Sequence, residues 1–388
     1  MDDLNIVCRD ESSTIHSNKG ISGYDDQTEI LTENGWRFFK DNQSDAKIAT
    51  MGSDGTLEYQ ASTGSSEIPF KGQMYHFENR SVDLCVTPNH TLYASTRCGK
   101  PCRFNLITAS DISIDNTLYF KKNANWTGQE TNTFELPSVV KYSGMNRTAH
   151  NSDPKILKTN DWFEFFGWYT AEGSIGWNNG TPYTVVISQN PGEKAEKIKR
   201  CIERLGFNYS IYGKGVGCDL ITICSKQLAT YMAQFGKQSE RFIPDYIKNA
   251  SPDQINLFLK PYVMGDGSVR YSKKCKNPVG STCIWTNSRQ LADDITELLL
   301  KCGTSGYHSL KVKAGTEANF PGGITSQARH DIFSVSFLGV FGNEPQLNSH
   351  GGGQIVIREY IGKIYNVKVQ NGLIYVRRNG KSLWSGSQ

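Results

Sequence analysis

The sequence predicts a multidomain protein in which an all-β domain, built from the N-terminal and C-terminal segments, carries an inserted α+β domain of two repeats. Three observations predict this architecture. Short apolar strands with tight turns occur near both ends of the chain, helix and strand patterns alternate between them, and one pattern, an apolar helix that ends in an acid before Gly-Ser, occurs twice. The 388 residues suffice for two or three domains of ordinary size.

The bulk composition is that of a globular protein, with 37% hydrophobic, 11% aromatic and 21% charged residues. No apolar run reaches the roughly 20 residues that span a bilayer, and the N-terminal residues lack the apolar core of a signal peptide. We therefore expect an intracellular, cytoplasmic protein without a membrane partner. The formal net charge of +4 permits a nucleic-acid partner without requiring one.

The β domain is predicted from residues 23–125 together with residues 355–388. The stretch "TEILTENGWRFF" indicates two strands around an Asn-Gly turn, and "KIATMGSDGTLEYQAS" repeats the arrangement around Asp54-Gly55. Residues 355–388 return to the same strand pattern. Residues 126–154 and 344–354 are expected to be linkers, and residues 1–22 an N-terminal flank.

The inserted domain is predicted at residues 155–343, with repeats at about 155–250 and 251–343. Each repeat begins with an apolar helix, at 161–172 and at 253–266, and continues with strands and a strongly helical run. The expected architecture is two pseudo-symmetric αββαββα units.

The two repeated helices each end in an acid, Glu172 or Asp266. Small residues four apart, Gly167 with Ala171 and Pro261 with Gly265, would let the two helices approach closely. Both carboxylates would then emerge beside the exposed carbonyls of the helix ends, where negative charge is unfavourable. A hard cation such as Mg²⁺ would neutralise such an all-oxygen pocket. The alternative, two ordinary acids before a glycine stop, is less favoured because the pattern is repeated.

The stretches "FFGWYTAEG" and "LKPYVMGDG" resemble the two motifs of a single-chain LAGLIDADG homing endonuclease, and the resemblance covers about residues 155–343. It implies a site-specific enzyme that hydrolyses both strands of a long DNA site with Mg²⁺ or Mn²⁺. It also implies metal ligation by Glu172 and Asp266, with the Ala171 and Gly265 carbonyls beside them. Pro261 departs from the usual glycine, and we expect it early in its helix, where proline is tolerated.

The same resemblance implies a basic residue near the active centre, just before an Ile-Pro pair. The stretch "GKQSERFIP" offers Arg241 and Lys237 as catalytic candidates. DNA contacts are expected from strands that lie along the major groove of a double-stranded target. The candidate strand residues are Gln189, Lys214, Arg270, Lys273, Lys274, Lys276, Lys311 and Lys313. A monomer with internal pseudo-two-fold symmetry is expected.

The β segments resemble an intein, the Hint domain that performs protein splicing. "YDDQTEILTENGW" and "VTPNHTLYAS" resemble its opening blocks, and "IYNVKVQNGLIYVRRNGKSLWSG" resembles its closing blocks. The resemblance implies that Thr87 and His90 activate the first peptide bond.

The positions that splicing needs depart from the intein pattern. The first residue, normally a Cys or Ser nucleophile, falls on Gly23, with Ser22 one residue away. A late histidine is replaced by Gly372, and the terminal asparagine falls on Ser387, unless Gln388 takes its place. Splicing is therefore predicted to be lost or impaired.

Three hypotheses follow. The preferred one is an intein-derived mobile endonuclease that no longer splices, of the kind found in bacteriophage and microbial genomes. The second is a splicing-competent intein altered at its junctions, and the third is a nucleic-acid-binding module that does not cleave.

Overall fold

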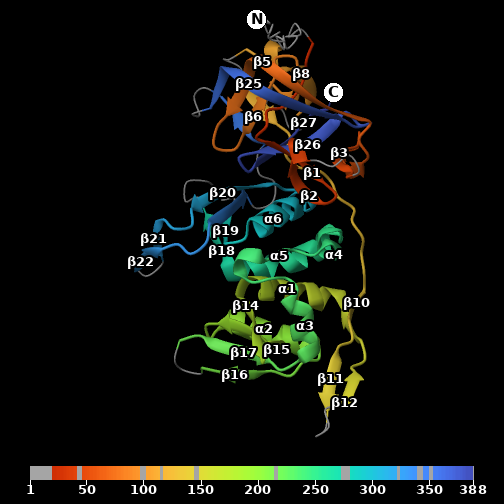
Figure 1. Ribbon diagram of the computed structural model, residues 1–388, viewed down its shortest axis with the longest axis vertical. Coiled ribbons are helices and arrows are strands. Elements are labelled where there is room, and N and C mark those ends of the chain that lie inside the picture. The colour runs from red at the N-terminus through yellow and green to blue at the C-terminus, as the bar shows by residue number, and fades with distance from the viewer. Residues whose placement is uncertain are drawn as a thin grey trace, which may run out of the picture.

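The computed structural model of the chain describes residues 20–41, 46–96, 102–113, 117–143, 148–213, 217–271, 280–320, 324–338, 344–348 and 353–387. These residues form an elongated molecule with a β domain at one end and two α+β repeats stacked below it (Figure 1). The second repeat lies next to the β domain, and the first repeat lies at the far end. No helix in these ranges is long and apolar enough to cross a membrane.

The β domain is built around a ten-stranded antiparallel sheet that joins both ends of the chain, because β1 pairs with β26 and places Ile30 opposite Val376. Its strands are β1 (Thr28–Thr32), β2 (Gly35–Phe38), β3 (Ile48–Met51), β4 (Leu57–Gln60), β7 (Thr91–Ser95), β8 (Asn105–Thr108), β9 (Leu118–Phe120), β24 (Gln346–Leu347), β26 (Leu373–Arg378) and β27 (Lys381–Gly386). A second sheet contains β5 (Gly64–Glu78), β6 (Asp83–Val86) and β25 (Gln354–Lys368). Short 3-10 helices lie at Phe39–Asp41 and Ala109–Asp111.

The predicted tight turns have a backbone reason. Gly35 and Gly55 have φ angles of 88° and 83°, which residues with a side chain rarely adopt. They close the β1–β2 and β3–β4 hairpins that the sequence predicted.

The first repeat follows the expected order. It contains α1 (Thr159–Glu172), β14 (Gly173–Asn178), β15 (Thr181–Gln189), α2 (Glu193–Arg204), β16 (Ser210–Tyr212), β17 (Asp219–Ile223) and α3 (Lys226–Ala233). Its four strands form one antiparallel sheet in the order β14-β15-β17-β16. A 3-10 helix, η3 (Gln238–Glu240), and α4 (Asp245–Lys248) lead to the second repeat.

The second repeat has the same start and a different end. It contains α5 (Pro252–Asp266), β18 (Gly267–Tyr271), β19 (Gly280–Thr286), α6 (Arg289–Lys301), β20 (Gly306–Val312) and β23 (Ile332–Leu338), with an added hairpin of β21 (Glu317–Phe320) and β22 (Ile324–Gln327). Its sheet order, β18-β19-β23-β20, matches that of the first repeat. The described residues after β23 contain no closing helix, so the expected αββαββα pattern is wrong for this repeat.

The two expected linkers contain strands. Within 126–154, β10 (Thr133–Leu136) pairs with β13 (Lys155–Lys158), and β11 (Val140–Ser143) with β12 (Thr148–Asn151) forms a hairpin at the far end of the molecule (Figure 1). Within 344–354, β24 pairs with β9 and extends the main β sheet. Both segments are polar in sequence, and short two-stranded pairings on a surface need little apolar patterning.

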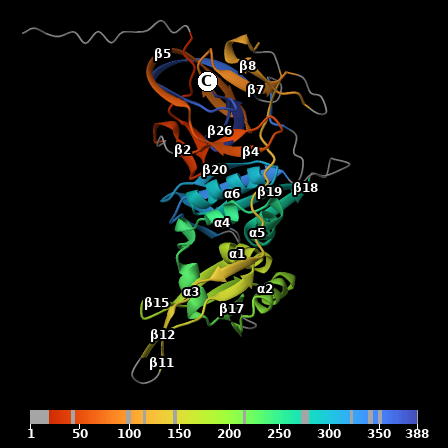
Figure 2. The same ribbon diagram turned by 90° about the vertical axis from the view of Figure 1, so that its right-hand side faces the viewer.

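The β domain and the second repeat share a buried interface, where α6 lies between the β strands and α5 (Figure 2). Leu300 of α6 packs with Leu31, Tyr375 and Trp384 of the β domain. Arg377 is fully buried there and donates to Glu29 at 2.7 and 2.8 Å and to Asp293 of α6 at 2.7 Å. Charged groups taken out of water require such pairing, so this network ties the two parts together.

Candidate functional site

The two acid-bearing helices, α1 and α5, pack with their backbones in direct contact. A Cβ placed on Gly167 would lie 2.7 Å from Cγ of Pro261 and closer still to the Phe258 carbonyl oxygen. A Cβ on Gly265 would overlap the Cβ of Ala171. The small residues at both crossings are therefore required, as the sequence predicted. Pro261 lies in the interior of α5 and not early in the helix; its ring fills the space that Gly167 leaves open.

Both helices end at their acids and continue directly into strands. The N–H of Gly173 closes α1 on the Tyr169 carbonyl, and the N–H of Gly267 closes α5 on the Val263 carbonyl. Cγ of Glu172 lies 3.6 Å from the position of a Cβ on Gly265, the neighbour of Asp266. The two carboxylates therefore emerge at one edge of the helix pair.

Glu172 is half-buried and shares its site with an amide. Gln189 Nε2 donates to Glu172 Oε1 at 3.4 Å. Burial raises the pKa of the Glu172 carboxyl, while the nearby Lys194 ammonium and the Gln189 hydrogen bond oppose the shift. Gln189 was predicted to contact DNA; in the structure its side chain is buried and hydrogen-bonds Glu172, and DNA contact by this residue stays a prediction. It follows Val185 and Ile187 on the inward face of β15, as the two-residue period of a strand requires.

Asp266 is the more strongly perturbed of the two acids. Burial raises its pKa to about 7, with the Glu172 charge as the second cause, and Arg241 and Lys194 oppose the shift. A buried carboxylate whose pKa is raised further by a neighbouring carboxylate forms a site that a bound cation would stabilise. Because the groups present are oxygen ligands, the chemistry of the site fits a hard divalent metal ion.

Arg241 caps the end of α1. Its guanidinium donates to the carbonyls of Tyr169, Thr170 and Gly173, and it is 7% exposed. These carbonyls carry the negative end of the helix dipole, so Arg241 offsets it. The Ala171 carbonyl lies between these acceptors and is not one of them. The sequence predicted Arg241 near the expected active centre, and the structure places its guanidinium at the C-terminal end of α1, from the segment that follows η3.

Of two lysines near this part of the chain, Lys194 acts on the two acids and was not predicted from the sequence. Lys237, the other catalytic candidate, is exposed directly before η3, has no described contact with either acid, and stays a prediction. Lys194, in the first turn of α2, lowers the pKa of both Glu172 and Asp266. Its place at the start of the helix that follows β15 is a positional clue, which sequence reasoning missed.

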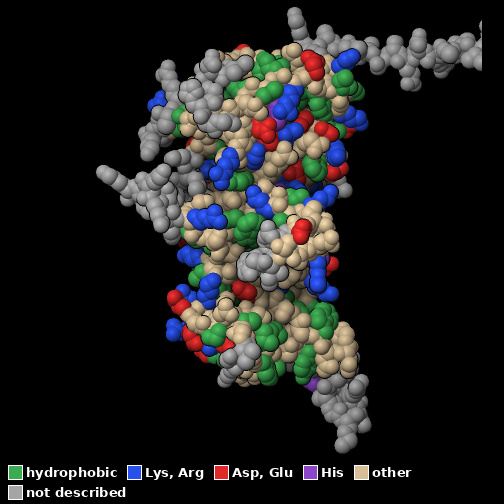
Figure 3. Space-filling view, turned by 90° about the vertical axis from the view of Figure 1, so that its left-hand side faces the viewer, with side chains coloured by type: hydrophobic (Ala, Val, Ile, Leu, Met, Phe, Trp, Pro, Cys, Tyr) green, Lys and Arg blue, Asp and Glu red, His purple; other side chains and the backbone are tan. Residues whose placement is uncertain are grey.

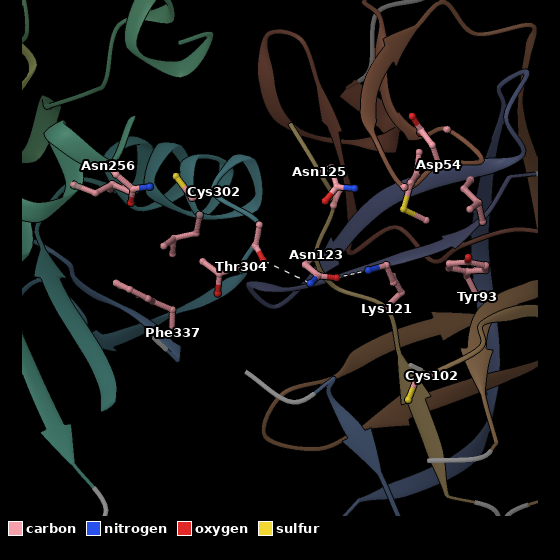
Figure 4. Close-up of a pocket in the computed structure, with 18 of the residues that line it drawn as sticks. Asp54, Tyr93, Cys102, Lys121, Asn123, Asn125, Asn256, Cys302, Thr304 and Phe337 are labelled. Atoms are coloured by element: carbon pink, nitrogen blue, oxygen red, sulfur yellow. Dashed lines mark hydrogen bonds between the residues drawn. The ribbon is translucent and has the colours of Figure 1, made fainter. Parts of the chain in front are cut away.

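A small cavity of about 170 Å³ opens beside Asp266, between Arg241, Tyr262 and Trp285. A much larger hollow of about 1500 Å³ lies between the β domain and helices α5 and α6 (Figure 4). Asn123 bridges part of it, accepting from Lys121 and donating to the Gly303 carbonyl at 3.5 Å. Neither acid lines this hollow, so it is separate from the candidate active site.

His76, Glu78 and Asp83 form another cluster of metal-type ligands in the β domain. The Asp83 carboxylate accepts from Arg378 Nη1 at 2.7 Å, from Asn379 at 2.9 Å and contacts His76 Nε2 at 2.9 Å. The guanidinium already supplies the positive charge, so this cluster is a buried ion network and not a metal site.

The remaining DNA-contact candidates divide into three groups. Arg270 and Lys311 are exposed on the second repeat and line a groove of about 430 Å³. Lys313 is exposed just beyond β20. The calls at Lys214, Lys273, Lys274 and Lys276 lie outside the described residues.

The groove beside Arg270 and Lys311 also has walls from the β domain. Arg80 and Lys381 line it opposite the strands of the second repeat, and its described lining contains no acid. Figure 3, which looks onto this side of the molecule, shows Lys and Arg side chains over the boundary between the two parts. Sequence reasoning did not assign Arg80 or Lys381, because only the fold brings them to this groove.

The intein-like residues Thr87 and His90 contact Ser22 and Gly23, near the first described residues of the β domain. The Gly23 N–H donates to Thr87 Oγ1 at 3.0 Å, and Ser22 Oγ lies 2.9 Å from His90 Nδ1. A Cβ on Gly23 would lie 3.0 Å from the Tyr365 carbonyl oxygen, so a nucleophilic side chain has little room at this position. The hydroxyl that reaches His90 belongs to Ser22.

The residues at the expected C-terminal junction, Gly386 and Ser387, are closely packed. Ser387 Oγ donates to the Val367 carbonyl at 2.7 Å and accepts from the Val369 N–H at 3.0 Å. A Cβ on Gly386 would lie 2.7 Å from the Thr91 carbonyl oxygen and would overlap its hydroxyl. Gly372 has a φ of 73° and open space around it. Gln388 lies outside the described residues.

Comparison with known proteins identifies part of the chain. Residues 164–236 and 253–330 match the family described as LAGLIDADG-like domain. The first match begins in α1 and the second in α5. These two stretches therefore resemble the LAGLIDADG-like domain, once in each repeat.

Two curated relatives resemble most of the chain. A DNA-directed RNA polymerase subunit beta C-terminal section from Stigeoclonium helveticum is 30% identical over 92% of this chain and 36% of its own length. An ATP-dependent Clp protease proteolytic subunit from Chlamydomonas moewusii is 26% identical over 73% of this chain and 28% of its own length. The chain thus spans about a third of the length of these relatives.

Solved structures resemble parts of the chain more distantly. I-DmoI in complex with DNA and Mn has a TM-score of 0.31 and 16% identity, over 46% of this chain and 89% of that one. A splice-inactive AceL NrdHF class 3 split intein has a TM-score of 0.22 and 16% identity, over 35% and 75%. Similarity this low transfers no activity to the present chain.

Proposed function

We propose that this chain, with its two LAGLIDADG-like repeats, is a site-specific endonuclease that hydrolyses both strands of double-stranded DNA, as a homing enzyme does. The observation that carries the proposal is the convergence of Glu172 and Asp266 at the ends of two helices in backbone contact, with the pKa of Asp266 raised to about 7. A fold keeps such a costly pair of acids where a function needs them.

The two carboxylates, with the Ala171 and Gly265 carbonyls at the adjoining helix ends, are the groups that would hold Mg²⁺ or Mn²⁺. A divalent metal bound there would stabilise the attacking and leaving oxygens of a phosphodiester displacement. Around it, Gln189 orients the Glu172 carboxylate, and Lys194 supplies positive charge to both acids. Arg241 holds the end of α1 in place and adds positive charge near Asp266.

The DNA surface that we propose runs along the outward faces of the two repeat sheets and into the groove between the second repeat and the β domain. Arg270, Lys311, Arg80 and Lys381 line this groove, and a cluster of cations in a groove lined by no acid favours a polyanion. Phosphate contacts of this kind give affinity, while strand side chains in the major groove choose the sequence. Because one chain carries both acids, we propose that it acts as a monomer.

The relatives support a mobile origin. The polymerase subunit and the protease subunit have unrelated names, yet each resembles most of this chain over only a minor part of its own length. A segment shared by two such proteins is most simply an inserted element. We propose that the chain is such an element, an intein-derived endonuclease that acts inside the cell.

Cleavage of a randomised DNA pool tests the proposal. The purified protein is incubated with duplexes that carry a randomised central segment, with Mg²⁺ or with EDTA, and all new ends are sequenced. We expect breaks at one or a few related long sites, with Mg²⁺ only, that are lost in Glu172→Gln and Asp266→Asn.

Glu164→Gln is the matched control, since Glu164 lies on the same helix and pairs with Arg204 at the surface. Selective DNA retention without any cleavage would replace the proposal with the non-cleaving binding module.

A second activity is favoured by one specific observation, the 2.9 Å contact between Ser22 Oγ and His90 Nδ1. We propose that Ser22 takes over the role for which Gly23 lacks a side chain, so that peptide-bond cleavage at the Ile21–Ser22 junction remains chemically accessible. The closed surroundings of Gly386 and the hydrogen bonds of Ser387 oppose the asparagine-type cyclisation that full splicing needs. Intact mass of the protein over time tests this activity, and a mass that never changes would exclude it.

A further inference from the structure

His90 is hydrogen-bonded through both ring nitrogens to two serine hydroxyls, one from the N-terminal and one from the C-terminal segment of the β domain. Nδ1 lies 2.9 Å from Ser22 Oγ, and Nε2 lies 3.3 Å from Ser385 Oγ on β27. His90 and Ser385 are both fully buried, and the Tyr24 ring meets the imidazole edge-on at 4.3 Å. The imidazole is therefore held on three sides.

The hydrogen bonds continue beyond Ser385. The Ser385 side chain also hydrogen-bonds the Tyr24 phenol, and Tyr24 O–H donates to the Gly386 carbonyl at 2.7 Å. Since the Tyr24 hydrogen is used on this carbonyl, its oxygen is left to accept from Ser385 O–H. The Ser385 oxygen is then left to accept from His90.

The charge state of His90 is consistent with His90 as the donor to Ser385. Burial lowers its pKa to about 3, so the ring is neutral at physiological pH and has one donor and one acceptor nitrogen. If Nε2–H donates to Ser385, Nδ1 accepts from Ser22 O–H. If Ser385 O–H instead donated to Nε2, either Tyr24 O–H would have to donate to Ser385 and lose its 2.7 Å bond to the Gly386 carbonyl, or the Tyr24 oxygen would have no donor.

We propose that Ser385 is a positioning residue that fixes His90 as the Nε2–H tautomer, so that Nδ1 can take the proton of the Ser22 hydroxyl. This inference rests on the second activity proposed above. Its logic is that of a nucleophile, a base and a third group that orients the base. The third group here is a neutral hydroxyl, itself oriented by Tyr24.

The reaction that this arrangement serves is an acyl shift within the chain's own backbone. Ser22 Oγ bonds to the carbonyl carbon of Ile21, and the carbon–nitrogen bond between Ile21 and Ser22 breaks. The proton passes from Oγ to Nδ1 and then to the leaving Ser22 nitrogen. Water then hydrolyses the ester, which leaves a carboxylate at Ile21 and restores the Ser22 hydroxyl beside a free amine.

Two contacts hold Ser22 in place for this step. Asn366 Nδ2 donates to the Ser22 carbonyl at 3.4 Å, and Thr87 accepts the N–H of the next residue, Gly23. Ser22 is thus pinned through its own backbone while its hydroxyl faces His90. A mobile serine would spend most of its time away from the base.

Nitrogen-15 NMR of the full chain tests the tautomer directly and needs no activity. In histidine-labelled protein, the His90 signals are assigned by their loss in His90→Gln. We expect the Nε2–H pattern in the wild type and a mixture of tautomers in Ser385→Ala. Ser382→Ala is the matched control, because Ser382 is a buried serine on the same strand that bonds Tyr375 at 2.9 Å. An identical His90 pattern in wild type and Ser385→Ala would overturn the positioning role.

Tyr24→Phe provides a second test if the Ser385 variant does not fold, because it keeps the ring against His90 and removes only the hydroxyl. We expect a partial shift of the tautomer pattern, and no shift would count against the relay.

Hydroxylamine, which cleaves esters, then measures the reaction by mass spectrometry. We expect slow release of the segment that ends at Ile21, none in Ser22→Ala, about tenfold less in Ser385→Ala and an unchanged rate in Ser382→Ala. Equal release from Ser385→Ala and wild type would overturn the inference. Absence of release from the wild type would refute the second activity, while the NMR result would still decide the tautomer.

Discussion

Ala171 and Gly265 face each other where α1 and α5 cross, and a Cβ on Gly265 would occupy the space of the Ala171 methyl group. This contact sets the separation of the two helix ends, and so it also sets the separation of the carboxylates one residue further on. The catalytic proposal therefore depends on a packing detail as much as on the acids themselves.

Gly265→Ala tests this dependence. In an isolated helix the change would be favourable by up to about 1 kcal/mol, but overpacking of a tight crossing costs about 1–3 kcal/mol, so we expect a net loss of stability. The cleavage rate should fall by more than the loss of folded protein explains, because the two carboxylates move apart. Chemical denaturation and cleavage rates measure the two effects. Gly64→Ala is the control, since its Cβ would meet only Lys368 Cδ at 4.0 Å; equal behaviour of the two variants would contradict the packing argument.

The raised pKa of Asp266 predicts a pH dependence of stability without metal. The folded state binds the Asp266 proton with a pKa of about 7, and the unfolded chain releases it near 3.8. Between these values the folded state holds the extra proton, so the free energy of unfolding falls as pH rises from about 4 to 7 and levels off above. Burial raises the pKa of Asp294 to about 7 as well, so it contributes in the same window.

Asp266→Asn should flatten part of this slope, and thermal melts from pH 4 to 8 in EDTA measure it. Mg²⁺ should restore stability to the wild type above pH 7 and leave the variant unchanged. If the stability of the wild type instead increased from pH 4 to 7, the pKa of the Asp266 carboxyl would not be raised in the folded state.

The sequence predicted the acid pair because its pattern is local: an apolar helix, small residues four apart and an acid before glycine. The strand order of the β domain was not predicted, although the Asn-Gly and Asp-Gly turns identified two of its hairpins. The burial of Gln189 could have been predicted from the sequence, since Val185, Ile187 and Gln189 alternate on the buried face of β15. A long polar side chain at a buried strand position signals a specific partner, here Glu172.

Other features lie beyond sequence reasoning because they join distant segments. Arg377 contacts Glu29 within the β domain and Asp293 across the domain interface, and the residues adjacent to each in sequence do not indicate either contact. His90 and Ser385 lie 295 residues apart in the sequence, on either side of the two repeats. Pro261 shows a third limit: a proline in mid-helix is unfavourable alone, and only the facing Gly167 explains its accommodation.

Arg377→Ala should destabilise the protein strongly. Its removal leaves the Glu29 and Asp293 carboxylates buried with weaker partners, and breaking a buried ion pair in this way costs about 3–5 kcal/mol. Calorimetry should show a lower melting temperature, and the β domain and repeats should begin to unfold separately. Arg358→Ala is the control: Arg358 is half-exposed and lies 3.8 Å from Glu78, so its loss should cost less than about 1 kcal/mol. A single unshifted transition in Arg377→Ala would contradict the structural role of the network.

Arg80 and Lys381 should extend the DNA site beyond the second repeat. In the double variant Arg80→Ala, Lys381→Ala, the loss of two phosphate contacts should lower the slope of log affinity against log salt by about 1.8. Lys381 also bonds the Asn79 carbonyl at 2.8 Å, so thermal melts must show that the double variant is folded. The footprint should shorten on one flank only, because the β domain adjoins the second repeat and not the first. Lys363→Ala, which removes an exposed cation of the β domain that pairs with Glu67, should leave both quantities unchanged. An unaltered footprint with an unaltered salt slope would confine DNA binding to the two repeats.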